Sequence, residues 1–243
     1  MRDTLEHDTL DLGGLQAEIT RKAIRHVHLS VLPPTGLVRV AAPAHVPLET
    51  IRLFVIAKLG WIRAQQRKLQ AQAREAPRLY RSKESHRVWG RQRLLELHRV
   101  AARPEVRLTG RKLHLQVRPD ADVVQCEAVL EAWFRQQLRA AVEPLLAQWE
   151  PVLGVKARQV HVQHMKTKWG SCSPVRQSIR LNTALVHKPL TCLEYIVVHE
   201  LLHLLEPTHN QRFQDLLVRH LPQWQQWRQQ LNRLPLRHED WRY

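Results

Sequence analysis

Cysteine is scarce in this chain: Cys126, Cys172 and Cys192 are the only three in 243 residues, and none belongs to a C-x-x-C pair. An odd number of widely spaced cysteines is not a disulfide framework and suits a reducing compartment. No stretch approaches the ~20 apolar residues that span a bilayer. The first ten residues carry four charged side chains in place of the apolar run of a signal peptide. We therefore expect a cytoplasmic protein without a disulfide scaffold.

Acidic residues are also few, 22 Asp and Glu against 38 Lys and Arg, and the net charge is +16. The excess concentrates between Lys58 and Arg93, where eleven basic residues face only Glu75 and Glu84. Such a segment is typical of a polyanion-binding surface, and equally of a solvated helix whose charges keep the protein in solution. Nucleic acid is therefore a candidate partner, beside a protein or peptide substrate.

The segment from His199 to His209 reads H-E-L-L-H-L-L-E-P-T-H. His199 and His203 are four residues apart and share one face of a helix, where two imidazoles supply half of a tetrahedral zinc site. Glu200 can take a proton from a zinc-bound water. Pro207 ends or turns the helix, which lets His209 return as a third ligand. With 15 His in the chain, H-E-x-x-H is expected by chance roughly 0.06 times. We therefore predict one zinc ion per chain.

The sequence before this motif predicts where its helix begins. Thr191 and Glu194 form a T-x-x-E pattern just after Pro189, which is typical of a capping box for a helix starting near Cys192. The residues that follow are apolar on nearly every side, so we expect a buried helix whose polar stripe consists of the two histidines and the glutamate.

The spacing of the three histidines also occurs in metzincins, but two features exclude that class. Metzincins require a glycine where Glu206 stands here, and a methionine turn downstream. The methionines of this chain, Met1 and Met165, both precede the motif.

The pattern along the chain predicts three regions: a flexible leader over residues 1–16, a β-rich region with a basic helix over 17–120, and a metallopeptidase core over 121–243. Turn residues and periodicity predict a hairpin from about Ala17 to Val40, a helix over Leu48–Arg74, and strands within 86–97 and 103–117 with a turn at Thr109-Gly110. A long helix is expected over Gln125–Trp149, with Val129, Ala132, Trp133, Gln136 and Leu138 on its inner side. Paired strands are expected over His161–Met165 and Ser178–Asn182 around a turn near Pro174, and a last helix over Asn210–Asn232, interrupted at Leu221-Pro222. The segment from Met165 to Asn182 is the candidate sheet edge for an extended peptide substrate.

Taken together, these segments make the chain resemble the YgjP-like metallopeptidases, zincins related to the WLM and Spartan (SprT-like) proteases. Lys168 stands where the family usually has arginine, a change that keeps the charge and loses the bidentate fork. The resemblance spans roughly residues 17 to 232. It rests on the following residues: M-K-T-K-W-G-S-C-S over 165–173, I-R-L-N over 179–182, Y-I-V-V-H-E-L-L-H over 195–203, His209-Asn210 and Phe213.

The resemblance implies an α+β, zincin-like (minigluzincin-type) core, in which an active-site helix packs on a small, mostly antiparallel sheet, preceded by an N-terminal hairpin and helix. It implies zinc binding by His199, His203 and His209, and a general-base role for Glu200. It also implies that the turn formed by Trp169, Gly170, Ser171 and Cys172 lines the cleft. The candidates for stabilising the oxyanion are Lys168, Asn182 and His164.

The leading hypothesis is therefore a zinc metallopeptidase, acting on proteins bound to nucleic acid if the basic segment binds that polymer. The alternative is a nucleic-acid-binding or adaptor protein whose zincin site is structural or latent. A third class, an amidohydrolase or peptidase acting on small substrates, remains open. Glu200 favours an enzyme, because a purely structural zinc site does not need a general base.

Overall fold

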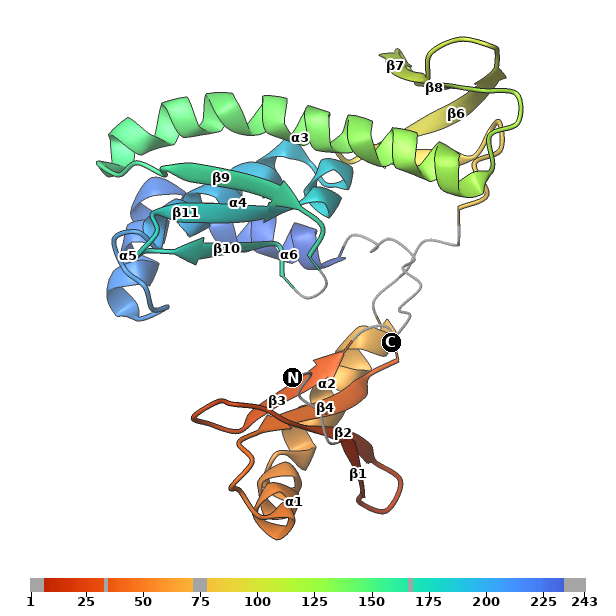
Figure 1. Cartoon of the computed structure of the whole chain (residues 1–243). Coiled ribbons are helices and arrows are strands. Elements are labelled where there is room, and N and C mark those ends of the chain that lie inside the picture. Colours follow the sequence, from red (N-terminus) through yellow and green to blue (C-terminus); the bar gives the residue numbers. More distant parts are fainter. Residues whose placement is uncertain (1–6, 33–34, 72–77, 166–167, 234–243) are drawn as a thin grey trace. The chain divides into compact units, whose positions relative to one another are not determined.

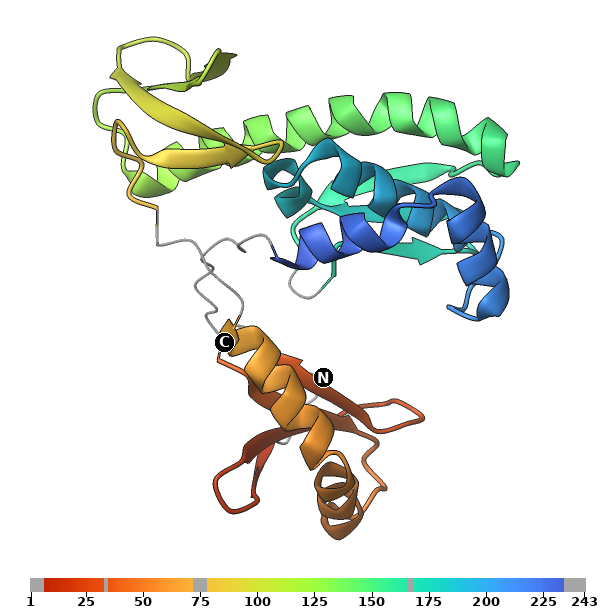
Figure 2. The same cartoon turned by 180° about the vertical axis from the view of Figure 1, so that it is seen from behind.

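The computed structural model describes residues 7–32, 35–71, 78–165 and 168–233. The chain forms two compact units, one built from the described residues up to 71 and the other from those between 78 and 233. Figures 1 and 2 show both units from opposite sides. We describe each unit by itself.

The N-terminal unit is a mixed sheet with two helices. Its elements are β1 (His7–Asp11), β2 (Gln16–Arg21), β3 (His28–Leu32), β4 (Leu37–Ala42), α1 (Leu48–Ala57) and α2 (Leu59–Ala71). The strand order is β1-β2-β4-β3, with a parallel β2–β4 pair between two antiparallel pairs. Alternate residues such as Ile19 and Val40 are buried against Ile51 and Val55 of α1, which gives this unit its own core.

Two expectations for this unit differ from the structure. Residues 7–11 of the predicted leader form a strand, because β1 pairs with β2 over five residues and buries Leu10. The predicted helix over Leu48–Arg74 is two helices, because Lys58 leaves helical geometry and ends α1; Arg74 lies outside the described residues. Within the predicted hairpin from about Ala17 to Val40, β3 and β4 form an antiparallel pair, whereas β2 pairs with β4 in parallel.

The second unit begins with another four-stranded sheet. Its strands are β5 (Ser85–Val88), β6 (Arg91–Arg99), β7 (Glu105–Thr109) and β8 (Lys112–Val117). The β7–β8 hairpin turns at Gly110-Arg111, one residue beyond the predicted turn, because Thr109 still pairs with Lys112. The order β5-β6-β8-β7, with a parallel β6–β8 pair in the centre, repeats the topology of the first sheet. No internal repeat was visible in the sequence, because the two sheets share pairing directions and not residues.

A long helix, α3 (Val123–Leu153), joins this sheet to the rest of the unit (Figure 1). Asp122 caps it by accepting from the Gln125 backbone, and the Gln125 side chain accepts from the Asp122 backbone in return. Its first half packs Leu130 and Phe134 against the sheet, and its second half packs Leu138 and residues beyond into a larger core. The division between compact units therefore falls near residue 75 and not at the predicted 120, because β5–β8 share a core with α3.

The rest of the unit is a three-stranded sheet covered by helices. Its elements are β9 (Gln159–Gln163), β10 (Gly170–Ser173), β11 (Ser178–Asn182), the 3-10 helix η1 (Thr183–His187), α4 (Leu190–Leu202), α5 (Gln211–His220) and α6 (Trp224–Arg233). The order is β10-β11-β9, antiparallel between β10 and β11 and parallel between β11 and β9. The predicted pairing around Pro174 thus joins β10 to β11, whereas β9 is a parallel neighbour. The fold is mixed α+β. The three-stranded sheet has one antiparallel and one parallel pair, so it is mixed where a mostly antiparallel sheet was expected.

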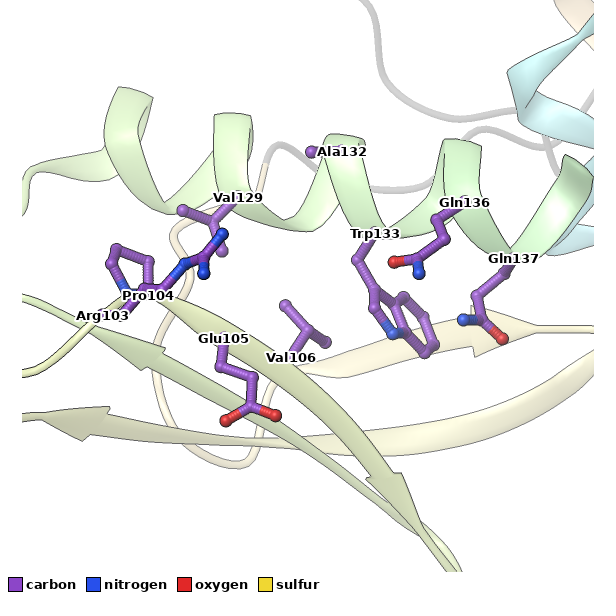
Figure 3. A pocket seen from close by; sticks show the side chains of 9 residues that line it. All are labelled: Arg103, Pro104, Glu105, Val106, Val129, Ala132, Trp133, Gln136 and Gln137. Carbon is purple, nitrogen blue, oxygen red and sulfur yellow. The ribbon is translucent and has the colours of Figure 1, made fainter.

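The inner side of α3 also differs from the expectation. The buried stripe includes Cys126, Leu130, Phe134 and Leu138, which recur every four residues. Of the expected residues, Leu138 is buried as predicted, and Val129 and Trp133 pack against the core while partly buried. Val129, Ala132, Trp133 and Gln136 also line an open cavity between α3 and the edge strand β7 (Figure 3). None of the residues lining this cavity belongs to the H-E-x-x-H segment.

Among the described residues, no helix combines the length and the apolar character needed to cross a bilayer.

Candidate metal centre

Helix α4 carries the first half of the site on an almost wholly buried segment. Its side chains from Tyr195 to Val198 are buried, as are Leu201 and Leu202. His199 and Glu200 lie in its last turn, and His203 is the C-cap residue, still in right-handed helical geometry. Its backbone N–H donates to the His199 carbonyl. The four-residue spacing therefore places the two imidazoles together, as the sequence predicted.

The predicted capping box at the start of α4 is wrong. The helix begins at Leu190 with Pro189 as N-cap, and no side chain caps it. The Pro189 carbonyl accepts from the backbone of Cys192 at 2.9 Å. Glu194 is used elsewhere: its carboxylate accepts a hydrogen bond from the indole of Trp149, 3.0 Å away on α3. Tertiary packing of Glu194 thus competes with local capping and prevails.

The chain turns after His203 and brings His209 back to the helix. The next helix, α5, starts at Gln211. The Asn210 side chain caps it by accepting a hydrogen bond from the Phe213 backbone at 3.0 Å. This cap fixes the position of His209, which immediately precedes the N-cap residue of α5. The His209 Nε2 atom lies 3.0 Å from His199 Nε2 and 3.1 Å from His203 Nε2.

The ring of Phe213 contacts all three imidazoles. Its side chain is 1% exposed, and its ring centroid lies 4.9 Å from that of His199, 4.7 Å from that of His203 and 4.9 Å from that of His209. The ring of Tyr195 makes an edge contact with that of His199, with the centroids 5.8 Å apart. The sequence analysis missed both roles; the N-x-x-F pattern at a helix start is the signal for Phe213.

The residues present fit a zinc ion. The Nδ1–H of His203 donates to the Glu206 carbonyl 3.0 Å away, which leaves the Nε2 lone pair directed at the other histidines. Burial lowers the pKa of His199 to about 3 and also lowers the pKa of His203. Neutral imidazoles are the form that binds metal. Three converging nitrogens are the protein ligand set of a zinc site that keeps an open position.

Glu200 lies beside this cluster and is 5% exposed. Burial raises its pKa to about 8, and the charge of Lys168 opposes that rise. Its Oε2 atom is buried without a hydrogen-bond partner among the described residues. Opposite the carboxylate lies Gly170, where an added Cβ would stand 2.5 Å from Glu200 Oε1. A side chain at residue 170 would therefore displace the Glu200 carboxylate or the strand.

The segment before β10 is fixed by Asn182. Its buried side-chain amide donates to the carbonyls of Met165 at 2.7 Å and Lys168 at 2.8 Å, and its oxygen accepts from the Ala184 backbone. Both amide hydrogens are therefore in use, so Asn182 positions this segment and is not available as an oxyanion donor. Lys168 remains a candidate, since its charge acts on Glu200. His164 is exposed just after β9.

The other residues predicted to line the cleft take different positions around β10. Trp169 packs on the main core, with Lys188 Nζ 5.1 Å from its ring centroid. Cys172 lies two residues from Gly170 on the same strand face, and burial, with Glu200 nearby, raises the pKa of its thiol to about 11. Ser171 alternates to the opposite face. Lys166 and Thr167, which also carried the resemblance, lie outside the described residues.

Comparison with known proteins assigns this chain to a family. The sequence profile of the YgjP-like family, described as a metallopeptidase domain, matches residues 25–234. Two solved structures are similar to part of the chain. The metallopeptidase zymogen abylysin of Pyrococcus abyssi is 24% identical over 37% of this chain and 90% of its own, with a TM-score of 0.35. The zymogen jannalysin of Methanocaldococcus jannaschii is 20% identical over 37% and 87%, with a TM-score of 0.34. No curated protein sequence matches significantly.

Proposed function

This chain belongs to the YgjP-like family of metallopeptidase domains, and from that premise we propose that it hydrolyses peptide bonds with one zinc ion held by His199, His203 and His209. The observation that carries the proposal is the convergence of three imidazole Nε2 atoms beside a buried carboxylate with an unpartnered oxygen. An unpartnered buried oxygen is costly to the fold. A reacting water beside Glu200 would give that oxygen a hydrogen-bond donor.

The residues of the site divide the chemistry between them. When bound, zinc supplies a Lewis acid and lowers the pKa of water to about 7. Glu200 accepts the proton of the attacking water and delivers it to the leaving amine, as a general base and then a general acid. Lys168 supplies a positive charge near the carbonyl oxygen of the substrate. Phe213 and the Glu206 carbonyl hold the imidazoles in the orientation that metal binding requires.

The substrate peptide is proposed to lie along β10. This strand has one strand neighbour, β11, within the described residues, so its other edge has free backbone donors and acceptors. Addition of a strand to such an edge orients a peptide through its backbone. Gly170 would place the peptide next to Glu200, because the two already approach closely.

Removal of the metal is expected to abolish cleavage of an unfolded, lysine-rich protein substrate, and readdition of Zn²⁺ is expected to restore it. The chelated protein should keep its far-ultraviolet circular dichroism, because the cores of the second unit do not depend on the histidines. Cleavage that persists in metal-free protein would reject the proposed role of zinc. Zinc binding without cleavage of any substrate would favour the adaptor alternative.

Nucleic acid is proposed as a partner through the exposed cations of the basic segment, which lie in both units, and those of α2 are tested first. The basic segment from Lys58 to Arg93 is divided between the two units, and residues 72–77 lie outside the described residues. In its second half Arg78 and Arg93 donate to backbone carbonyls, so these cations already serve the fold. On α2, Arg63 and Arg67 are exposed.

We expect Arg63→Gln/Arg67→Gln to weaken retention on double-stranded DNA and to lower the salt dependence of binding. With fewer contacts to phosphates, the protein releases fewer counterions from the DNA when it binds. The matched control, Arg158→Gln/Arg176→Gln, removes the same charge from exposed positions of the second unit. DNA retention should be measured from low to moderate salt. An equal loss of DNA retention in both variants would mean that net charge, and not the position of the arginines, causes the effect. A wild-type protein that is not retained on DNA at low salt would contradict nucleic acid as a partner.

A further inference from the structure

A second cluster of metal-ligand side chains lies on the sheet β5–β8. The parallel register of β6 and β8 places Glu96 opposite His114, and His98 follows Glu96 by two residues on the same face. The opposite face, with Leu95, is buried against α3. The three polar side chains therefore share the outer face of the sheet, and their ligand atoms form a group that could hold a cation.

The distances in this cluster are those of ligands around one ion. His114 Nδ1 lies 3.2 Å from His98 Nε2 and 3.2 Å from Glu96 Oε2. Two ligands bound to tetrahedral zinc at about 2.0–2.1 Å are about 3.3 Å apart. The first site has the same signature, with nitrogen pairs at 3.0 and 3.1 Å.

Hydrogen bonding alone serves this arrangement poorly. If His98 donates to His114 Nδ1, the lone pair of that nitrogen is used and Glu96 Oε2 faces it without a proton. If His114 Nδ1 carries the proton, a single N–H must be divided between His98 and Glu96. A cation among the three atoms satisfies all of the lone pairs at once.

The neighbouring charges leave the ligand atoms accessible. Lys112 Nζ lies 2.5 Å from Glu96 Oε1, so the other carboxylate oxygen faces the histidines. Arg107 pairs across the sheet with His114, but Glu105 holds its guanidinium with contacts of 2.7 and 2.8 Å. An open cavity of about 320 Å³ over this face is lined by His98, Glu105, Arg107, Thr109, His114 and Gln116, which leaves room for water as a further ligand.

We propose that Glu96, His98 and His114 bind a divalent first-row transition-metal cation, with Zn²⁺ as the probe, that links β6 to β8. Two imidazoles and one carboxylate are a ligand set that such cations prefer. The site is independent of His199, His203 and His209, and the ion would cross-link the two central strands of this sheet.

The test is the zinc content of the full chain after equilibrium dialysis at buffered free Zn²⁺. Wild type is expected to hold two ions, and His98→Gln/His114→Gln is expected to hold one. His199→Gln/His203→Gln, which leaves this sheet unchanged, is also expected to hold one. The control His28→Gln/His161→Gln removes two exposed histidines from other strands and should keep two.

Two results would overturn the proposal. One is a His98→Gln/His114→Gln protein that keeps the wild-type zinc content. The other is a His199→Gln/His203→Gln protein that holds no zinc, since the sheet cluster is intact there. Thermal unfolding gives a second readout: Zn²⁺ should raise the Tm of the His199→Gln/His203→Gln protein, and should not do so once His98 and His114 are also replaced. Peptidase activity enters neither measurement, so a failure here is distinct from a failure of the proposed function.

Discussion

Glu200→Gln is expected to abolish peptide cleavage and to leave zinc binding in place. The carboxylate is the proposed proton carrier, and the amide that replaces it is nearly the same size but cannot accept a proton from water. Loss of a general base costs about 10²–10⁴-fold in rate. The measurement is a cleavage time course on an unfolded, lysine-rich protein with zinc-loaded wild type and variant side by side, together with their zinc content.

Glu194→Gln is the matched control for this variant. Glu194 lies on the same helix, and glutamine retains an oxygen that can accept from the Trp149 indole. The control should therefore cleave at the wild-type rate. Equal cleavage by Glu200→Gln and wild type would mean that the proton carrier is another group, and zinc loss in the variant would mean that Glu200 acts on the metal ligands instead.

Gly170→Ala is expected to have the second-largest effect, because the added methyl group has no room. Its Cβ would lie 2.5 Å from Oε1, 2.8 Å from Cγ and 2.9 Å from Cδ of Glu200. The carboxylate or the strand must move, and a displacement of about 1 Å at a reacting group can cost about 10²-fold in rate. We expect kcat/KM to fall by about that factor while the zinc content stays at the wild-type value.

Two further variants show whether the effect of Gly170→Ala acts through Glu200. Gly60→Ala in α2 is the matched control, since nothing lies within 4 Å of a Cβ added there. The double variant Gly170→Ala/Glu200→Gln should be no slower than Glu200→Gln alone, because groups that act as a unit are not additive. A further loss in the double variant would assign Gly170 a separate role, for example in seating the substrate along β10.

The helix of the site was predictable because its signals are local. Spacing of four residues places His199 and His203 together in any α-helix, and apolar residues on nearly every side indicate a buried one. The start of the helix was mispredicted, because the Glu194 side chain of the T-x-x-E pattern does not cap the helix. It accepts a hydrogen bond from Trp149, which is 45 residues away in the sequence. Sequence alone does not reveal that competition.

Strand pairing was harder to predict than strand position. The alternation of Ile179 and Leu181 marks β11 whichever way its neighbours run. The parallel pairing with β9 depends on the path of the chain through β10, and the sequence between them does not encode direction. For the same reason the shared core of α3 and β5–β8, which sets the division near residue 75, was visible only in the fold.

By itself, the sequence predicted His199 and His203 as candidate metal ligands, the adjacent carboxylate, the third histidine as a further candidate, and the family to which the chain belongs. The tertiary structure alone decided that His209 closes on the pair over Phe213, that Gly170 contacts Glu200, that Asn182 is occupied by backbone carbonyls, and that Glu96, His98 and His114 meet on one sheet face. The physical reason is the range of the forces involved. Helix spacing is fixed within one turn by backbone geometry, whereas contacts between segments depend on the packing and register of the whole unit.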